Sequence, residues 1–121
     1  LLCGIFMNSK QLQNRLINFS VLCYDLISTV KRTEPGQVLR MQLARSCTSP
    51  APNYAESTSA ESRADFKHKL SIVTKELRES AINLEILKRA RLADKTKLET
   101  VSDECDQLIS IFVKTVKSLS Q

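Results

Sequence analysis

The chain has 121 residues, 42% of them hydrophobic, with two glycines, three prolines and no tryptophan. This length supports one domain with one core and excludes a two-domain enzyme with separate cofactor and substrate modules. The shortage of glycine excludes a glycine-rich phosphate loop and a many-stranded β fold. A single all-helical domain remains. Its net charge of +5 modestly favours acidic partners.

Residues 1–8 are predicted to be a disordered or artefactual N-terminal segment outside the fold. The apolar run 1–6 lacks a preceding basic stretch and is too short for the core of an export signal. No apolar run approaches the roughly 18–20 residues that span a bilayer. We therefore expect a cytoplasmic protein with no membrane contact, whose single domain covers residues 9–121.

The first predicted helix runs to about Arg32, because apolar residues recur along it at steps of three and four. Residues 33–36 contain a proline–glycine pair and are predicted to form a turn. The second helix is expected to begin near Gln37. The residues that it would bury are Val38, Leu39, Leu43, Ala44 and Cys47.

The second helix is predicted to kink or break near residues 49–52. Pro50 and Pro52 lack a backbone N–H, and each would collide with the carbonyl group four residues earlier in an unbroken helix. With Ser49 as N-cap and Pro50 as the first helical residue, the helix can restart at low cost.

A polar linker at residues 57–62 precedes the third predicted helix. Its apolar residues, from Phe66 to Leu87, alternate steps of four and three as in a coiled-coil seam. Asp94 is expected to cap the fourth helix, which carries the same kind of stripe. Four long helices joined by short loops predict an all-α, antiparallel up-down-up-down four-helix bundle.

The third and fourth helices carry further apolar residues outside these seams. They are Ile72, Ile82, Ile86, Ile109, Ile111 and Val113. A stripe wider than a monomeric bundle needs indicates a second buried face and therefore self-association. The alternative is that the stripe is only the wide apolar face of a globular helix.

The sequence offers little for catalysis or metal binding. His68 is the single histidine, and although Asp65 lies one turn away, a two-metal site in a helical bundle needs several Glu and His ligands. The four cysteines show no CxxC spacing and are expected to be buried apolar residues. We expect no catalytic residues, no metal, no cofactor and no enzymatic activity.

Basic residues gather at the ends of the predicted bundle, and acidic residues gather around its middle. One end would carry Lys31, Arg32, Arg40, Lys88, Arg89, Arg91, Lys95 and Lys97. Such an end suits the backbone of RNA or DNA, because Lys and Arg neutralise phosphates and release counterions. Cations at a helix C-terminus also complement the helix dipole, but this alternative does not cover Lys95 and Lys97, which lie near a helix start.

The second helix and the linker resemble the bacterial four-helix-bundle family encoded in intervening sequences of 23S rRNA genes. In that family a Gln-Leu-x-Arg-(Ala/Ser)-(Ala/Cys) run leads to Ser-x-Pro-x-Asn-x-Ala-Glu-Gly and then to a Phe-x-x-x-Leu helix. The residues that carry the resemblance are Gln42, Leu43, Arg45, Ser49, Asn53, Ala55, Glu56, Phe66, Leu70, Leu77, Glu79 and Leu84. The chain departs from the pattern by placing prolines at 50 and 52 instead of one at 51, and Ser57 where Gly is usual.

The resemblance implies a homo-oligomer, specifically a homopentamer, from a family without an established enzymatic activity. A related branch, the accessory variability determinants of diversity-generating retroelements, forms basic pentamers that bind a reverse transcriptase and nucleic acid. The partners implied are therefore further copies of the chain, RNA or DNA, and a reverse transcriptase or other protein.

For the motif residues Arg45, Asn53 and Glu56 we favour a structural role over a functional one. Asn53 and Glu56 would satisfy polar groups freed by the proline break, and Arg45 would pair with Glu56. The leading hypothesis is a non-enzymatic oligomeric bundle whose basic ends contact nucleic acid or a nucleic-acid-processing partner. The alternative is an oligomeric scaffold that contacts only protein.

Overall fold

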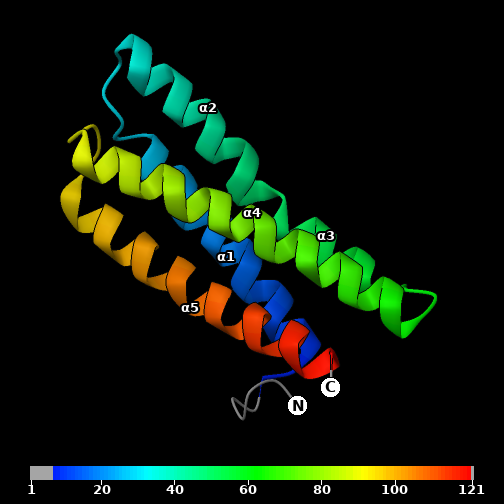
Figure 1. Cartoon of the computed structure of the whole chain (residues 1–121). Coiled ribbons are helices and arrows are strands. Elements are labelled where there is room, and N and C mark those ends of the chain that lie inside the picture. Colours follow the sequence, from blue (N-terminus) through cyan, green and yellow to red (C-terminus); the bar gives the residue numbers. More distant parts are fainter. Residues whose placement is uncertain (1–6, 121) are drawn as a thin grey trace.

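The computed structural model describes residues 7–120, so residues 1–6 of the predicted N-terminal segment 1–8 lie outside the described residues. Its helices are α1 (Ser9–Ile27), α2 (Glu34–Thr48), α3 (Pro50–Ser57), α4 (Arg63–Arg89) and α5 (Lys95–Leu119). Figure 1 shows α1, α4 and α5 as long neighbouring helices, with α2 and α3 joined end to end as one bent arm. The arm packs against α1 and α4, which both also pack against α5. The predicted all-α four-helix bundle with a kinked second helix is confirmed.

Polar side chains fix where the helices begin. Asn8 and Gln11 form a capping box at the start of α1, each side chain accepting a hydrogen bond from the other residue's backbone N–H. Ser62 accepts from the N–H of Asp65 at the start of α4. Asp94 accepts from the N–H of Lys97 at 2.8 Å, which confirms its prediction as the cap of α5.

The connection between the first two helices lies earlier than predicted. α1 ends at Ile27 rather than near Arg32, and α2 begins at Glu34 rather than at Gln37. The predicted turn 33–36 is instead the cap and first turn of α2. Thr33 accepts from the N–H of Gly36 at 3.1 Å, and a proline in a first turn costs nothing because its N–H would have no helical partner there.

Gly36 is buried because the chain passes very close to it. A Cβ atom at this position would lie 2.0 Å from the carbonyl oxygen of Lys31. The glycine therefore provides a close backbone approach rather than the predicted turn conformation. It holds the 28–33 connection against the first turn of α2.

Two residue-level predictions for the second helix are wrong. Val38 is 57% exposed, because only the side of α2 that carries Leu43 and Cys47 faces the bundle. Ser49 has helical dihedral angles and makes no capping hydrogen bond; its hydroxyl donates to the carbonyl of Arg45 at 3.0 Å. The backbone therefore continues through a kink, with Pro50 in the first turn of α3, instead of ending and restarting at a cap.

The core is one cluster that all five helices share. Its largest fully buried side chains are Phe19, Phe112, Leu12, Leu16, Leu26, Leu43, Leu70, Leu77, Leu84, Leu87, Leu108 and Val73. Each contributes roughly 1.5–3 kcal/mol relative to an exposed position. Tyr54 of α3 meets Phe112 of α5 edge to face, with ring centroids 5.6 Å apart, so the short helix after the kink is anchored to the far side of the core.

Candidate functional site

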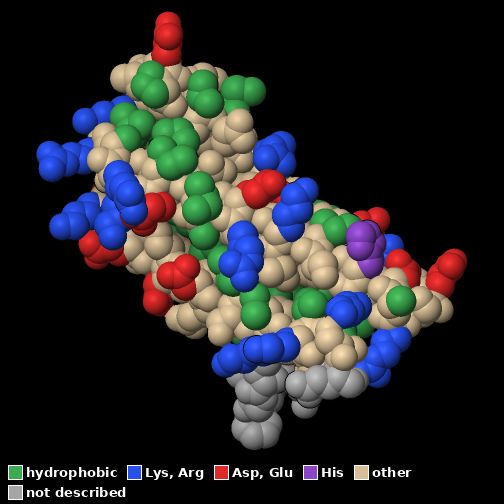
Figure 2. Space-filling model, in the orientation of Figure 1, with side chains coloured by type: hydrophobic (Ala, Val, Ile, Leu, Met, Phe, Trp, Pro, Cys, Tyr) green, Lys and Arg blue, Asp and Glu red, His purple; other side chains and the backbone are tan. Residues whose placement is uncertain are grey.

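Two connections meet at one end of the bundle and bring the predicted basic residues together there. The N–H of Lys31 donates to the carbonyl of Leu92 at 2.8 Å, and the N–H of Asp94 donates to the hydroxyl of Thr29 at 3.0 Å. These bonds join the 28–33 connection to the α4–α5 connection. In Figure 2, Lys and Arg side chains gather where α4 ends and α5 begins.

We call this surface the basic end. It comprises Lys31, Arg32, Lys88, Arg89, Arg91, Lys95 and Lys97.

Most cations of the basic end are free to meet a ligand. Arg89 pairs with Glu85 one turn earlier in α4, with Nε and Oε2 2.7 Å apart, and this hydrogen bond lowers the pKa of the Glu85 carboxyl. Among the described residues, the other cations of the basic end make no ion pair within 4.0 Å. The end therefore keeps a net positive charge that an anionic partner can meet.

Helix dipoles explain only part of this charge. Lys88 and Arg89 lie in the last turn of α4, where cations are favourable. The first turn of α5 has no acidic residue and instead carries Lys95 and Lys97, which is the less favourable sign at a helix N-terminus. The dipole alternative fails at these two lysines.

Arg91 has the unusual backbone of the basic end. Its φ angle is 56°, and among the described residues Arg91 is the non-glycine residue with a positive φ. It directly follows the cap of α4, where the N–H of Leu92 donates to the carbonyl of Leu87 at 3.1 Å in a Schellman arrangement. Glycine is the usual residue at such a site, so an arginine is held here at a cost to stability.

Among residues 7–120, no hydrogen bond or ion pair joins Arg40 to the residues of the basic end. It lies nearly two turns into α2 and donates to the side-chain oxygen of Gln37 on the same helix. Figure 1 shows that the first turns of α2 project beyond the end of the bundle. Of the residues predicted to contact nucleic acid, Arg40 is therefore the one that we leave out of the basic end.

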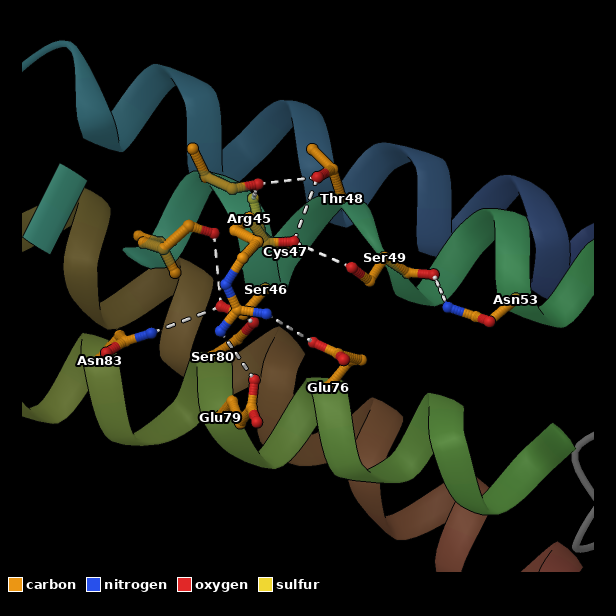
Figure 3. A network of polar contacts seen from close by, with 12 residues as sticks. Arg45, Ser46, Cys47, Thr48, Ser49, Asn53, Glu76, Glu79, Ser80 and Asn83 are labelled. Carbon is orange, nitrogen blue, oxygen red and sulfur yellow. Dashed lines mark hydrogen bonds and ion pairs between the residues drawn. The ribbon is translucent and has the colours of Figure 1, made fainter. Parts of the chain in front are cut away.

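Of the motif residues, Arg45 and Asn53 lie on either side of the kink, as Figure 3 shows, and Arg45 has other partners than the one predicted. Arg45 pairs with two residues of α4, Glu79 at 3.1 Å and Glu76 at 3.7 Å. Its predicted partner Glu56 is exposed on α3 and has no ion pair among the described residues. The kink directs Arg45 across to α4, whereas Glu56 lies three turns further along the arm.

Asn53 makes a hydrogen bond just after the kink. Its side-chain amide donates to the carbonyl of Ser49 at 2.8 Å, and the same carbonyl accepts from the backbone N–H of Asn53 at 3.2 Å. The side chains of α1 complete the same task, since Ser20 donates to the carbonyl of Cys47 at 2.6 Å and Gln13 to that of Ala51 at 2.9 Å. Side chains of α1 and α3 therefore donate to backbone carbonyls on both sides of the kink.

Buried hydroxyl groups tie the arm to α4 beside the kink. Ser46 and Ser80 are both fully buried, and the Ser80 hydroxyl donates to the Ser46 oxygen at 2.9 Å. Asn83 donates to the same oxygen at 3.4 Å. These polar contacts, drawn in Figure 3, lie beside the Arg45 ion pairs that also join α2 to α4.

Glu76 is the unusual carboxyl of this region. Its side chain is 12% exposed, and its Oε1 atom has no hydrogen-bond partner in the structure. Burial raises the pKa of Glu76, and the neighbouring charge of Glu79 raises it further, while Arg45 opposes the shift. Sequence reasoning did not predict that Glu76 is buried, although Glu76 and Glu79 stand three apart on one helix, a spacing that places two carboxyls close together.

The described residues offer no group of three or more His, Cys, Asp or Glu side chains placed to hold a metal ion. Cys23, Cys47 and Cys105 are free and buried, as predicted, and Cys3 lies outside the described residues. Burial and the nearby Asp106 and Glu104 carboxylates raise the pKa of Cys105 to about 12. A buried thiol with a raised pKa is inert as a nucleophile. In this part of the chain no helix is both long and apolar enough to cross a membrane.

Fold and site together define a small helical-bundle protein with a bent arm, formed by α2 and α3, and a basic end. The sequence model of the family described as 23S rRNA-intervening sequence protein matches residues 9–114. The chain therefore belongs to this family, as its motif had indicated.

A solved structure shares the fold over nearly the whole chain. It is a protein of unknown function from the S23 ribosomal protein family of Bacteroides thetaiotaomicron VPI-5482. The two chains are 27% identical, the match covers 92% of this chain and 99% of the other, and the TM-score is 0.81. No curated protein matches the chain.

Proposed function

We propose that the protein is a non-enzymatic, self-associating four-helix bundle whose basic end binds the phosphate backbone of RNA or DNA. The observation that carries the proposal is the joining of two connections that holds Lys31 and Arg32 beside the α4–α5 cations. A preformed basic surface pays little ordering entropy when it meets a phosphate backbone. The family's name, which refers to 23S rRNA, makes a structured RNA the appropriate first probe.

The proposed binding follows the backbone rather than the base sequence. The basic end contains no aromatic side chain on which a base could stack. Lysine and arginine contacts to phosphates position a protein on nucleic acid but carry no direct sequence information. We therefore expect a shape-led, salt-dependent interaction.

Self-association is the second part of the proposal. Of the apolar residues predicted to lie outside the seams, Ile111 is in the core, whereas Ile82 and Ile86 are exposed on α4. Exposed large apolar side chains in a row favour a protein contact. A homopentamer is the state that the family resemblance implies.

The test is a filter-binding titration against a structured RNA at two salt concentrations. We expect Lys88→Glu/Arg91→Glu/Lys95→Glu to abolish binding at low salt, because three phosphate contacts are replaced by three repulsions. The matched control, Lys10→Glu/Lys67→Glu/Lys114→Glu, makes the same charge change away from the basic end and should retain most of the affinity. Equal loss in both variants would refute a local site, and no binding by the wild type at low salt would favour the protein-only scaffold.

A further inference from the structure

The outer side of α4 carries a groove of about 900 Å³. It is lined by residues of α4 between Ser71 and Asn83, by two residues of α2 and by three residues of α5. α2 and α5 both pack against α4 but not against each other, so they border the groove from different sides. We call this surface the α4 groove.

The α4 groove has an apolar part. Ile82 of α4 is 63% exposed, and Val113 and Val116 of α5 line the same groove. In Figure 2, hydrophobic side chains follow α4 across this face with Lys and Arg side chains beside them. Such a surface gains free energy when it is covered by another apolar surface, so a fitting occupant brings apolar side chains of its own.

The charged residues of the α4 groove are mostly basic. Lys75, Arg78 and Lys117 line it, and among the described residues none of the three makes an ion pair within 4.0 Å. The other two charges of the groove, Arg45 and Glu79, lie 3.1 Å apart and neutralise each other. Three unpaired cations therefore remain, and they favour an occupant that carries carboxylates.

The length of the α4 groove suits a helix. α4 lines it from Ser71 to Asn83, which is about 18 Å, or roughly three turns, at 1.5 Å per residue. An amphipathic helix of this length presents apolar side chains at steps of three and four to a groove, with charged side chains on either flank. A nucleic-acid strand fits less well, because none of the residues that line the groove is aromatic and a base would have no stacking partner.

The described part of the chain does not itself present such a helix. Its exposed large apolar side chains lie on α1, α2 and α4. α1 contains a single acidic residue, Asp25, and α2 contains only Glu34, while the acidic residues of α4 all take part in ion pairs. No described helix therefore combines an exposed apolar stripe with several free carboxylates, and the fitting occupant is a different protein.

We propose that the α4 groove binds an acidic amphipathic α-helix of a different protein. The apolar stripe of that helix packs on Ile82, Val113 and Val116. Its carboxylates face Lys75, Arg78 and Lys117. This site is separate from the basic end, and its recognition of a partner does not depend on nucleic acid.

The test measures how synthetic peptides bind to the full chain, by fluorescence anisotropy. The probe is a labelled peptide of about four helical turns, with leucines at steps of three and four and glutamates flanking them. One control peptide has the same residues in scrambled order, and the other has lysine in place of every glutamate. The wild type should bind the acidic peptide about tenfold or more tightly than either control.

Variants of the groove separate its two contributions. Arg78→Glu/Lys117→Glu should lose affinity for the acidic peptide and gain affinity for the lysine peptide, because two of the three unpaired cations become carboxylates. Ile82→Gln should weaken binding of the acidic peptide about tenfold by removing an apolar contact. All three positions are exposed, so helicity measured by circular dichroism should stay unchanged.

Two matched controls change residues outside the α4 groove. Lys88→Glu/Lys95→Glu makes the same charge change at the basic end, and Met41→Gln removes a 65% exposed apolar side chain of α2. Both should bind the acidic peptide as the wild type does at about 0.15 M salt, where exposed charges more than about 8 Å apart are largely screened. The RNA titration should give the reverse pattern, with a loss at the basic end and none in the groove.

The contrary results are distinct. Equal affinity for the three peptides, or no binding of the acidic one, would overturn the proposal, and an equal loss in Lys88→Glu/Lys95→Glu would move the peptide to the basic end. Dissociation of a wild-type oligomer by Ile82→Gln in sedimentation velocity would show that a second copy occupies the groove. Loss of RNA binding by Arg78→Glu/Lys117→Glu would show that nucleic acid does. Each result would overturn the proposed partner, while RNA binding at the basic end keeps its own test.

Discussion

Replacing Arg91 by glycine should stabilise the protein while weakening its binding to nucleic acid. Arg91 has a φ of 56°, a conformation that costs a residue with a Cβ atom roughly 1–2 kcal/mol. Glycine avoids this cost but loses about 0.4–1 kcal/mol more chain entropy on folding. The balance is a gain of about 0.5–1 kcal/mol in the free energy of unfolding.

Arg91→Ala is the matched comparison, because alanine also removes the guanidinium group but keeps the Cβ atom that makes the conformation costly. The glycine variant should therefore melt roughly 2–5 °C higher than the alanine variant by calorimetry. The two variants should lose the same affinity for RNA, since each lacks the same phosphate contact. A glycine variant no more stable than the alanine variant would refute the strain argument, and unequal affinities would show that backbone geometry, rather than charge, controls binding.

Three further predictions concern the interior. Gly36→Ala should lower the free energy of unfolding in urea by about 1–3 kcal/mol, because its Cβ would meet the Lys31 carbonyl at 2.0 Å; unchanged stability would contradict the close approach. Ser80→Ala should cost about 1–2 kcal/mol by removing a donor to the buried Ser46 oxygen, and a double Ser46→Ala/Ser80→Ala variant should cost less than the sum of the two single changes. Because the pKa of Glu76 is raised, the folded state binds the carboxyl proton more tightly than the unfolded state does. The free energy of unfolding should therefore fall as pH rises from about 4.3, the ordinary glutamate value, through the raised pKa. Glu76→Gln should remove this decline, and parallel stability–pH profiles for the two proteins would count against the prediction.

The fold could be predicted from local signals because the apolar spacing is regular in each helix. The third and fourth predicted helices correspond to α4 and α5, including the Asp94 cap. The first connection was misplaced because Pro35 and Gly36 read as a turn, whereas a proline is equally suited to a first helical turn. Which use applies depends on the tertiary contact between Gly36 and the Lys31 carbonyl, and no local pattern encodes that contact.

The candidate site was predictable in outline but not in its pairings. Placing basic residues at one end needed only the order of the helices, and the structure adds the hydrogen bonds that join the two connections. The partner of Arg45 could not be predicted, because a proline break sets no definite angle for the chain that follows it. A groove of about 900 Å³ over the outer side of α4 could not be predicted either, because it combines side chains of α4, α5 and the arm, whose relative rotation the sequence leaves open.

The Ser46–Ser80 contact has a consequence for how the arm can move. A helix that packs only through leucines can slide by one turn, about 5.4 Å, and find similar neighbours. Such a slide of α2 along α4 would break the bond between the two buried hydroxyls and leave the Ser80 hydroxyl without its partner on α2. The hydroxyl pair therefore sets the register of the arm, and because the kink lies directly beside it, the two halves of the arm keep fixed positions even though they point in different directions.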